Sequence, residues 1–151
     1  AFHRVHPDRV KALLIIDTGP GFRKDAARDA WNARAIETAK TFETDGLKSL
    51  QSASRERSTS THRDATGLAL AARGMLAQRD AGVIDSLPSI KVPSLVLVGS
   101  EDKPFLAATD YMAAKIAGAV KVVIPGAGHA ANIDQPQAFN EAVVKFLGGL
   151  R

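Results

Sequence analysis

The chain has 151 residues, of which 45% are hydrophobic and 24% charged, a composition within the range of globular proteins. Lysine and arginine (20 residues) exceed aspartate and glutamate (16 residues), which leaves a net charge of +4. Basic and acidic residues alternate, and only one Trp and one Tyr are available for base stacking, so the sequence disfavours nucleic-acid binding. The absence of cysteine excludes disulfides and a cysteine nucleophile, but it does not distinguish a reducing from an oxidising compartment.

No segment of the sequence has the length and apolarity of a membrane helix. The apolar run at residues 12–16 is far shorter than the roughly 20 residues that a membrane span needs. No basic segment followed by an apolar signal core opens the chain. We therefore expect a soluble, cytoplasmic protein that does not bind membranes. The sequence begins with Ala1 rather than Met, which suggests cleavage or truncation.

The amino-terminal part predicts the end of a helix at residues 2–7, followed by a strand at residues 10–16. A continuous apolar stretch that leads into a Gly- and Pro-rich turn is typical of a parallel strand covered on both faces. Asp17 directly follows this strand, where we expect it to cap the turn at residues 18–21.

Two amphipathic segments predict a helical insertion in the middle of the chain. Apolar residues recur every three or four positions in residues 24–50, which predicts a helix. Residues 51–61 are rich in Ser, Thr and Arg and predict an exposed loop or hinge. The sequence at residues 61–64 has the spacing of a capping box and predicts the start of a second helix, which extends to Leu76.

The last third of the chain has the most regular pattern. Residues 92–99 and 120–124 predict strands, and residues 104–116 and 136–147 predict helices that begin with proline. We expect Asp134 to belong to a capping box for the last helix. Strands that alternate with helices are typical of a parallel sheet with right-handed crossovers. The fold class that we predict is therefore α/β, with three parallel strands, flanking helices and a helical insertion.

Asp102 and His129 follow two successive predicted strands. Reactive groups collect at the carboxyl ends of parallel strands, so these two side chains can meet there. A carboxylate bound to one imidazole nitrogen leaves the other nitrogen free to accept a proton from a hydroxyl nucleophile. The alternative is a structural role for each, with Asp102 as a loop cap and His129 as a turn residue.

The segments around these residues resemble those of the α/β-hydrolase family. Residues 92–102 read V-P-S-L-V-L-V-G-S-E-D, similar to the family segment V-P-x-L-x-x-x-G-x-x-D that carries the catalytic acid. Residues 128–136 read G-H-A-A-N-I-D-Q-P, similar to the segment that carries the catalytic histidine. The resemblance implies that Asp102 is the acid and His129 the base. Some family members are thought to place the acid where Asp17 lies, but Asp102 matches its own segment better.

The resemblance also assigns parts of the fold. It implies that residues 1–21 contain the end of the nucleophile helix and a core strand, residues 22–91 a helical lid and connector, and residues 92–151 the closing part of the core. The family carries its nucleophile in a G-x-S-x-G elbow upstream of these segments, and the sequence contains no such pattern. We therefore expect the carboxyl-terminal half of a longer hydrolase, and an inactive isolated chain.

Several other side chains are candidates for the site. Phe22, Trp31 and Phe105 are candidates for an apolar substrate pocket, and core packing is the alternative for each. Ser100 lacks the sharp elbow that exposes a serine nucleophile, so we expect it to be structural. The spacing of the remaining histidines, His3, His6 and His62, does not indicate a metal site.

The leading hypothesis is a hydrolase of small apolar esters or related acyl compounds that requires no cofactor. A serine from outside this chain would complete the triad with Asp102 and His129. The alternative is a noncatalytic interaction module that pairs with another chain through an exposed sheet edge beside residues 10–16. The expected partner is the missing amino-terminal half or a second copy of the chain.

Overall fold

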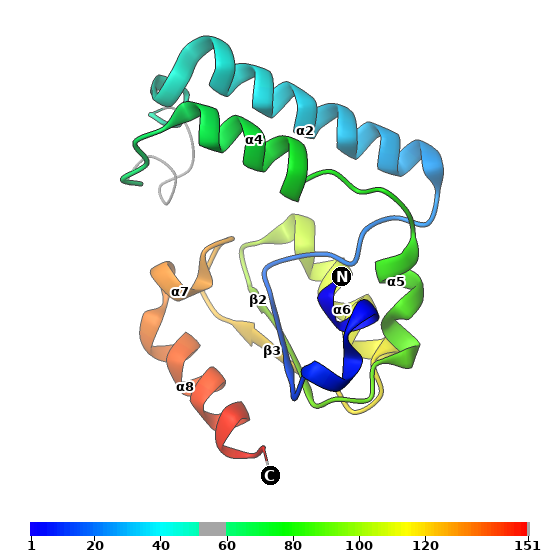
Figure 1. Cartoon of the computed structure of the whole chain (residues 1–151). Helices are drawn as coiled ribbons and strands as arrows, with labels where there is room; N and C mark the ends of the chain where they lie inside the picture. Colours follow the sequence, from blue (N-terminus) through cyan, green and yellow to red (C-terminus); the bar gives the residue numbers. More distant parts are fainter. Residues whose placement is uncertain (52–59, 151) are drawn as a thin grey trace. The chain divides into compact units, whose positions relative to one another are not determined.

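A computed structural model describes residues 1–51 and 60–150 of the chain. It contains one parallel sheet with the strand order β1-β2-β3, made of β1 (Leu13–Ile16), β2 (Ser94–Gly99) and β3 (Val120–Ile124) (Figure 1). The helices are α1 (Phe2–Val5), α2 (Asp25–Asp45), α4 (Ala65–Met75), α5 (Gly82–Ser86), α6 (Lys103–Lys115), α7 (Ala131–Asp134) and α8 (Pro136–Gly148). Short 3-10 turns cover Pro7–Arg9, Gly46–Leu50 and Leu87–Ser89. The predicted α/β class with three parallel strands and flanking helices is confirmed.

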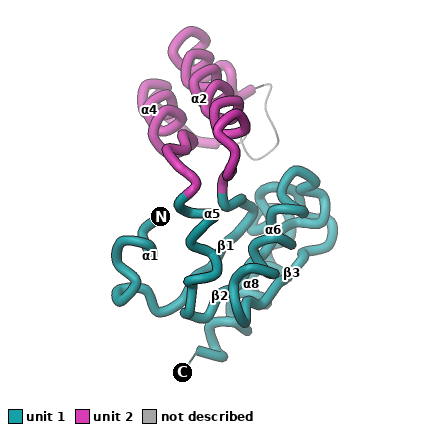
Figure 2. The backbone as a smooth tube through the Cα atoms, turned by 90° about the vertical axis from the view of Figure 1, so that its right-hand side faces the viewer, with its two compact units in different colours: residues 1–20, 82–151 teal, residues 21–81 magenta. Residues whose placement is uncertain are grey.

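The chain folds into two compact units (Figure 2). Unit 1 comprises Ala1–Pro20 and Gly82–Arg151 and contains the sheet; unit 2 comprises Gly21–Ala81 and contains α2 and α4. Residues 82–91, the end of the segment that the resemblance assigns to the lid and connector, belong to unit 1. Within the described part of the chain, no helix combines the length and apolarity needed to cross a membrane.

The central strand β2 is buried along its whole length and connects two apolar cores. Successive strand residues point to opposite faces of a sheet. Leu95 and Leu97 accordingly pack on one face with Ala131 and the apolar side of α8, whereas Val96 packs on the other face with Met112 of α6 and residues near α5. A strand covered on both faces is typical of parallel sheets in α/β proteins.

The first strand is shorter than the sequence predicts. The 3-10 turn Pro7–Arg9 ends at Val10, and β1 begins only at Leu13, whose N–H donates to the carbonyl of Pro93 at 2.9 Å. Among the described residues β1 pairs with β2 alone, and Leu14 is 37% exposed. The expectation that this strand is covered on both faces is therefore wrong at Leu14.

Unit 2 is a pair of helices that pack through small side chains. Ala39 and Phe42 of α2 contact Ala69 and Ala72 of α4 in its core. Arg73 binds both carboxylate oxygens of Glu43 across the helix pair, at distances down to 2.8 Å. Arg and carboxylate groups match in such a fork geometry, which adds specificity to the small apolar contact.

The two helices of unit 2 begin and end differently from the sequence prediction. Helix α2 stops at Asp45 because Gly46 adopts a positive φ of 62°. Helix α4 begins with Asp64 as its N-cap, whose carboxylate accepts the N–H groups of Thr66 and Gly67, so the capping box predicted at residues 61–64 is wrong. The predicted loop at residues 51–61 lies mostly outside the described residues.

Gly99, the last residue of β2, has no room for a side chain. A Cβ there would overlap the backbone carbonyl oxygens of Ala127 and Gly128, which lie in the loop after β3. Backbone atoms of a buried loop cannot rotate away as a flexible side chain can. The loop that leads to His129 therefore packs directly on the end of β2.

We expect Gly99→Ala to lower the free energy of unfolding by roughly 1–3 kcal/mol, the usual cost of forcing extra volume into a packed site. Chemical denaturation measures this change. Gly148→Ala is the matched control, because a Cβ at Gly148 meets nothing within 4 Å, and its effect should stay within about 0.5 kcal/mol. Equal effects of the two substitutions would contradict this reading of the contact.

Candidate functional site

Three loops leave the sheet at the same edge because all three strands run parallel. The register places Ile16 of β1 beside Leu97 of β2, and Gly99 of β2 beside Ile124 of β3. The segments that follow these strands begin with Asp17, Ser100 and Pro125. This edge is the usual place for reactive groups in an open parallel sheet.

The structure brings Asp102 and His129 together at this edge. Oδ2 of Asp102 lies 2.8 Å from Nδ1 of His129, a hydrogen-bond distance. The Asp102 side chain is 5% exposed and that of His129 is 53% exposed. Asp102 occupies the N-cap position of α6, but its side chain makes no capping hydrogen bond. The alternative of a purely capping aspartate therefore does not describe its contacts.

This pair has the geometry needed for proton transfer. The buried carboxylate holds one imidazole nitrogen, and the exposed ring leaves Nε2 available to another group. When Nδ1 carries the proton that Asp102 accepts, Nε2 has a free lone pair and can act as a base. Asp102 then also stabilises the imidazolium that forms.

Backbone hydrogen bonds fasten the loop of Asp102 to the loop of His129. Glu101 N–H donates to the carbonyl of Ala127 at 2.8 Å, and Ser100 N–H donates to that of Ile124 at 2.9 Å. In return, Gly126 N–H donates to Oγ of Ser100 at 2.8 Å. The hydroxyl of Ser100 thus supports the junction between the loops, in line with the structural role expected for it.

Asp134 stabilises the histidine loop and not the last helix. Its Oδ2 accepts the N–H of Gly128, the residue before His129, at 2.8 Å. Helix α8 has Gln135 as its N-cap and no side-chain capping bond. The capping box predicted around Asp134 is wrong because its carboxylate reaches back to the loop instead.

Asp17, which the sequence predicts to cap a turn, contacts both segments of this site. It is 8% exposed and has a positive φ of 44°, which is uncommon for a residue other than glycine. Its Oδ1 accepts the N–H of Gly99 at 2.9 Å, and its Oδ2 accepts the N–H of Ala131 at 3.3 Å. Its carboxylate therefore bonds to the end of β2 and the start of α7, the two elements that border the loops of Asp102 and His129, and not to its own turn.

The charge environment of Asp17 includes both members of the pair. Burial raises the pKa of Asp17 above its ordinary value, the N–H groups of Gly99 and Ala131 lower it, and the neighbouring charges of Asp102 and His129 act in opposite directions. The desolvation of a carboxylate disfavours its charged form, which explains the net direction. Asp17 is thus electrostatically coupled to the other two groups.

The three aromatic candidates fall in different units. Phe105, at the start of α6 in unit 1, stacks on the imidazole of His129 with ring centroids 5.0 Å apart and an interplanar angle of 28°. In unit 2, the rings of Phe22 and Trp31 lie 6.0 Å apart, and the Trp31 indole N–H donates to the carbonyl of Leu76 at 2.6 Å. The structure therefore places Phe105 directly at the imidazole and pairs Phe22 with Trp31.

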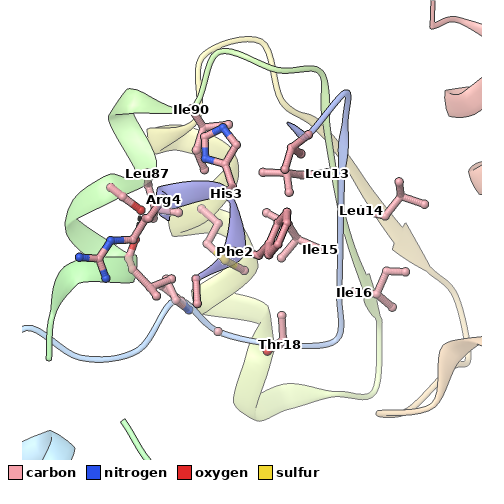
Figure 3. A pocket seen from close by; sticks show the side chains of 17 residues that line it. Phe2, His3, Arg4, Leu13, Leu14, Ile15, Ile16, Thr18, Leu87 and Ile90 are labelled. Carbon is pink, nitrogen blue, oxygen red and sulfur yellow. Dashed lines mark hydrogen bonds between the residues drawn. The ribbon is translucent and has the colours of Figure 1, made fainter. Parts of the chain in front are cut away.

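An apolar cavity of about 590 Å³ lies beside β1 in unit 1 (Figure 3). Its lining includes Phe2, Leu13, Ile15 and Leu87, and its polar groups include His3. Neither Asp102 nor His129 contributes to it. Of the residues that the structure describes, no three His, Asp or Glu side chains form a group suited to a metal ion.

The sequence matches the alpha/beta hydrolase family over residues 3–142. The Bacillus subtilis (strain 168) protein provisionally named 2-succinyl-6-hydroxy-2,4-cyclohexadiene-1-carboxylate synthase is 25% identical over 165 aligned residues, which cover 97% of this chain and 60% of that protein. The chain thus spans about three fifths of the length of this relative.

Two solved structures resemble the chain closely. A thermophilic esterase from Thermogutta terrifontis has a TM-score of 0.79 at 26% identity, with 99% of this chain and 60% of the esterase covered. The enol-lactonase from Burkholderia xenovorans LB400 has a TM-score of 0.78 at 26% identity, with 98% of this chain and 60% of the lactonase covered. The likeness to both extends over unit 1 and unit 2.

The raised pKa of Asp17 predicts a pH-dependent stability difference. Because the folded state binds this proton more tightly than the unfolded state, the ionised side chain opposes folding at neutral pH, and this effect disappears as the pH falls through the raised pKa towards the ordinary value of 3.8. We expect the free energy of unfolding of the wild type, relative to that of Asp17→Asn, to increase over this range. Chemical denaturation at several pH values measures it, and a constant or decreasing difference would contradict the assignment.

Proposed function

We propose that this chain, which belongs to the alpha/beta hydrolase family, supplies the acid and the base of a serine-type triad that hydrolyses esters or related acyl bonds. The observation that carries the proposal is the 2.8 Å hydrogen bond between buried Asp102 and exposed His129 at the carboxyl edge of the sheet. The similarity to a thermophilic esterase and an enol-lactonase supports acyl compounds as substrates.

In the proposed reaction, His129 Nε2 removes the proton of a serine hydroxyl as that oxygen attacks the acyl carbon. The same proton then passes from the imidazolium to the leaving alcohol, and an acyl-enzyme remains. Water, activated in turn by Nε2, releases the acid and restores the serine. Asp102 keeps Nδ1 protonated throughout and stabilises the positive ring, and the mechanism needs no cofactor.

We assign the serine and the oxyanion donors to a further segment of the protein, outside these 151 residues. The chain contains no G-x-S-x-G elbow and spans 60% of its curated relative. Ser100 is a poor candidate because its hydroxyl accepts the N–H of Gly126 and also contacts Glu101. We therefore propose that the isolated 151-residue chain has negligible hydrolytic activity.

The proposed substrates are small and apolar. Phe105 presents an aromatic ring beside the imidazole, where it can contact the acyl or alcohol part of an ester. Phe22 and Trp31 form an aromatic pair within unit 2, and their assignment to the substrate pocket stays a prediction from the sequence. The role of unit 2 as a lid is likewise part of this proposal.

In the longer protein to which we propose that this chain belongs (the native-length protein), we expect His129→Gln to reduce the hydrolysis of p-nitrophenyl acetate roughly 10⁶-fold and Asp102→Asn roughly 10⁴-fold, because each removes a group needed for proton transfer. Steady-state kinetics measures the loss in kcat. His6→Gln is the matched control, because this exposed imidazole lies against Phe2 and away from the pair, and its kcat should not change. A His129 variant with wild-type kcat would contradict the proposed base.

A second measurement tests the missing nucleophile. The isolated 151-residue chain should hydrolyse p-nitrophenyl acetate no faster than buffer does, since it lacks the elbow serine. Rapid hydrolysis by this chain that Ser100→Ala abolishes would contradict the proposal and assign the nucleophile to Ser100.

A second candidate function is a noncatalytic interaction module that pairs with another chain through the exposed sheet edge beside β1. The apolar cavity beside β1 and the exposure of Leu14 favour it. We propose that a segment of the same protein covers this edge, because the relatives are longer than this chain. If the native-length protein is monomeric in sedimentation experiments, a segment of the same protein covers the edge. A stable homodimer would contradict this and indicate that a second copy covers it.

A further inference from the structure

We propose that Asp17 is a positioning residue that sets the geometry of the Asp102–His129 pair by holding both of their loops. This inference rests on the proposed acid and base roles of that pair. Asp17 itself touches neither reacting atom; it acts through the backbone at the root of each loop.

The first contact controls the loop of the acid. Oδ1 of Asp17 accepts the N–H of Gly99 at 2.9 Å, and the carbonyl of Gly99 accepts the N–H of Asp102 at 3.1 Å. One residue of β2, Gly99, thus connects the Asp17 carboxylate to the backbone of the acid. A shift of Gly99 would move Asp102 with it.

The second contact controls the loop of the base. Oδ2 of Asp17 accepts the N–H of Ala131 at 3.3 Å, two residues after His129. Ala131 is fully buried and begins helix α7. Asp134 accepts the N–H of Gly128, so carboxylates hold the backbone on both sides of His129.

The backbone of Asp17 shows that this arrangement is built into the fold. A φ of 44° costs free energy for a residue other than glycine, and such a conformation persists only where the surroundings impose it. Here the N–H of Asp17 donates to the carbonyl of Leu97 at 2.9 Å, which ties the residue to the end of β2. The left-handed turn directs its carboxylate across the sheet edge towards the two N–H groups.

Burial of the ionised Asp17 carboxylate costs free energy. Desolvation of an ionised side chain is unfavourable, and two N–H groups lower that penalty without removing it, as the raised pKa shows. An asparagine could occupy the same turn, since Asn tolerates positive φ. Its amide, however, offers one acceptor oxygen and one NH₂ group, so it cannot accept both N–H groups with separate oxygens.

The test compares Asp17→Asn with wild type in the native-length protein by NMR spectroscopy and ester hydrolysis. In the wild type we expect a downfield Nδ1 proton resonance from the hydrogen bond between His129 and Asp102. In Asp17→Asn we expect that resonance to broaden or move upfield, kcat for p-nitrophenyl acetate to fall roughly 10- to 100-fold, and KM to stay within about twofold. This combination separates positioning from a general loss of structure.

Two further variants make the result decisive. Glu141→Gln removes an exposed carboxylate of α8 that contacts Gln137, outside the loops of the pair, and should leave both the resonance and kcat unchanged. Asp17→Gly removes the carboxylate and relieves the backbone strain, so it tests the proposal if Asp17→Asn does not fold.

An unchanged resonance and kcat in a folded Asp17 variant would overturn the proposal, as would failure of both Asp17 variants to fold. A different result tests the proposed function. If the wild type shows the downfield resonance, Asp17→Asn loses it, and neither protein hydrolyses esters, the positioning role stands and the hydrolase function is wrong.

Discussion

The parallel pairing of β2 with both neighbouring strands is the constraint on which this structure depends. Because β1, β2 and β3 run in the same direction, the segments after all three strands emerge at one edge. The burial of β2 on both faces fixes its register, since a slip by one residue would exchange the side chains of the two apolar cores. The strand thereby fixes where the acid and histidine loops begin.

At this edge, individual hydrogen bonds hold the loops in place, as regular secondary structure does elsewhere in the chain. Asp17 bonds to the end of β2 and the start of α7, Ser100 and Glu101 connect the acid loop to the segment after β3, and Asp134 holds the residue before His129. Each of these contacts joins backbone to backbone or to a short side chain with little freedom. Such a network orders a site more firmly than long, exposed ion pairs would.

Much of this arrangement could be predicted from sequence. Strand and helix patterns gave the three parallel strands, and the chain positions of Asp102 and His129 after successive strands indicated that they meet. The start of β1 was less predictable, because its hydrogen bonds to the neighbouring strand begin only at Leu13, which donates to the carbonyl of Pro93 just before β2. The apolar pattern of a strand begins at residue 10, whereas the hydrogen bonds that define β1 begin only at Leu13.

The roles of the other carboxylates could not be found in this way. Asp17 accepts N–H groups from residues 82 and 114 positions away in the chain, and no local spacing encodes such distances. Asp134 and Asp102 both sit at positions that suit a helix cap, yet both bond elsewhere. A short carboxylate near a helix start has a local and a long-range choice of donors, and only the tertiary structure decides between them.

The indole contact in unit 2 has a practical consequence. Trp31 is the single tryptophan of the chain, and its N–H is hydrogen-bonded to Leu76 within unit 2, whereas the single tyrosine, Tyr111, packs against the apolar core beside α6 in unit 1. Unit 2 thus contains the tryptophan fluorophore and unit 1 the tyrosine fluorophore. Fluorescence excited selectively at the indole follows unit 2, and comparison with the tyrosine signal shows whether the two units unfold together or one after the other.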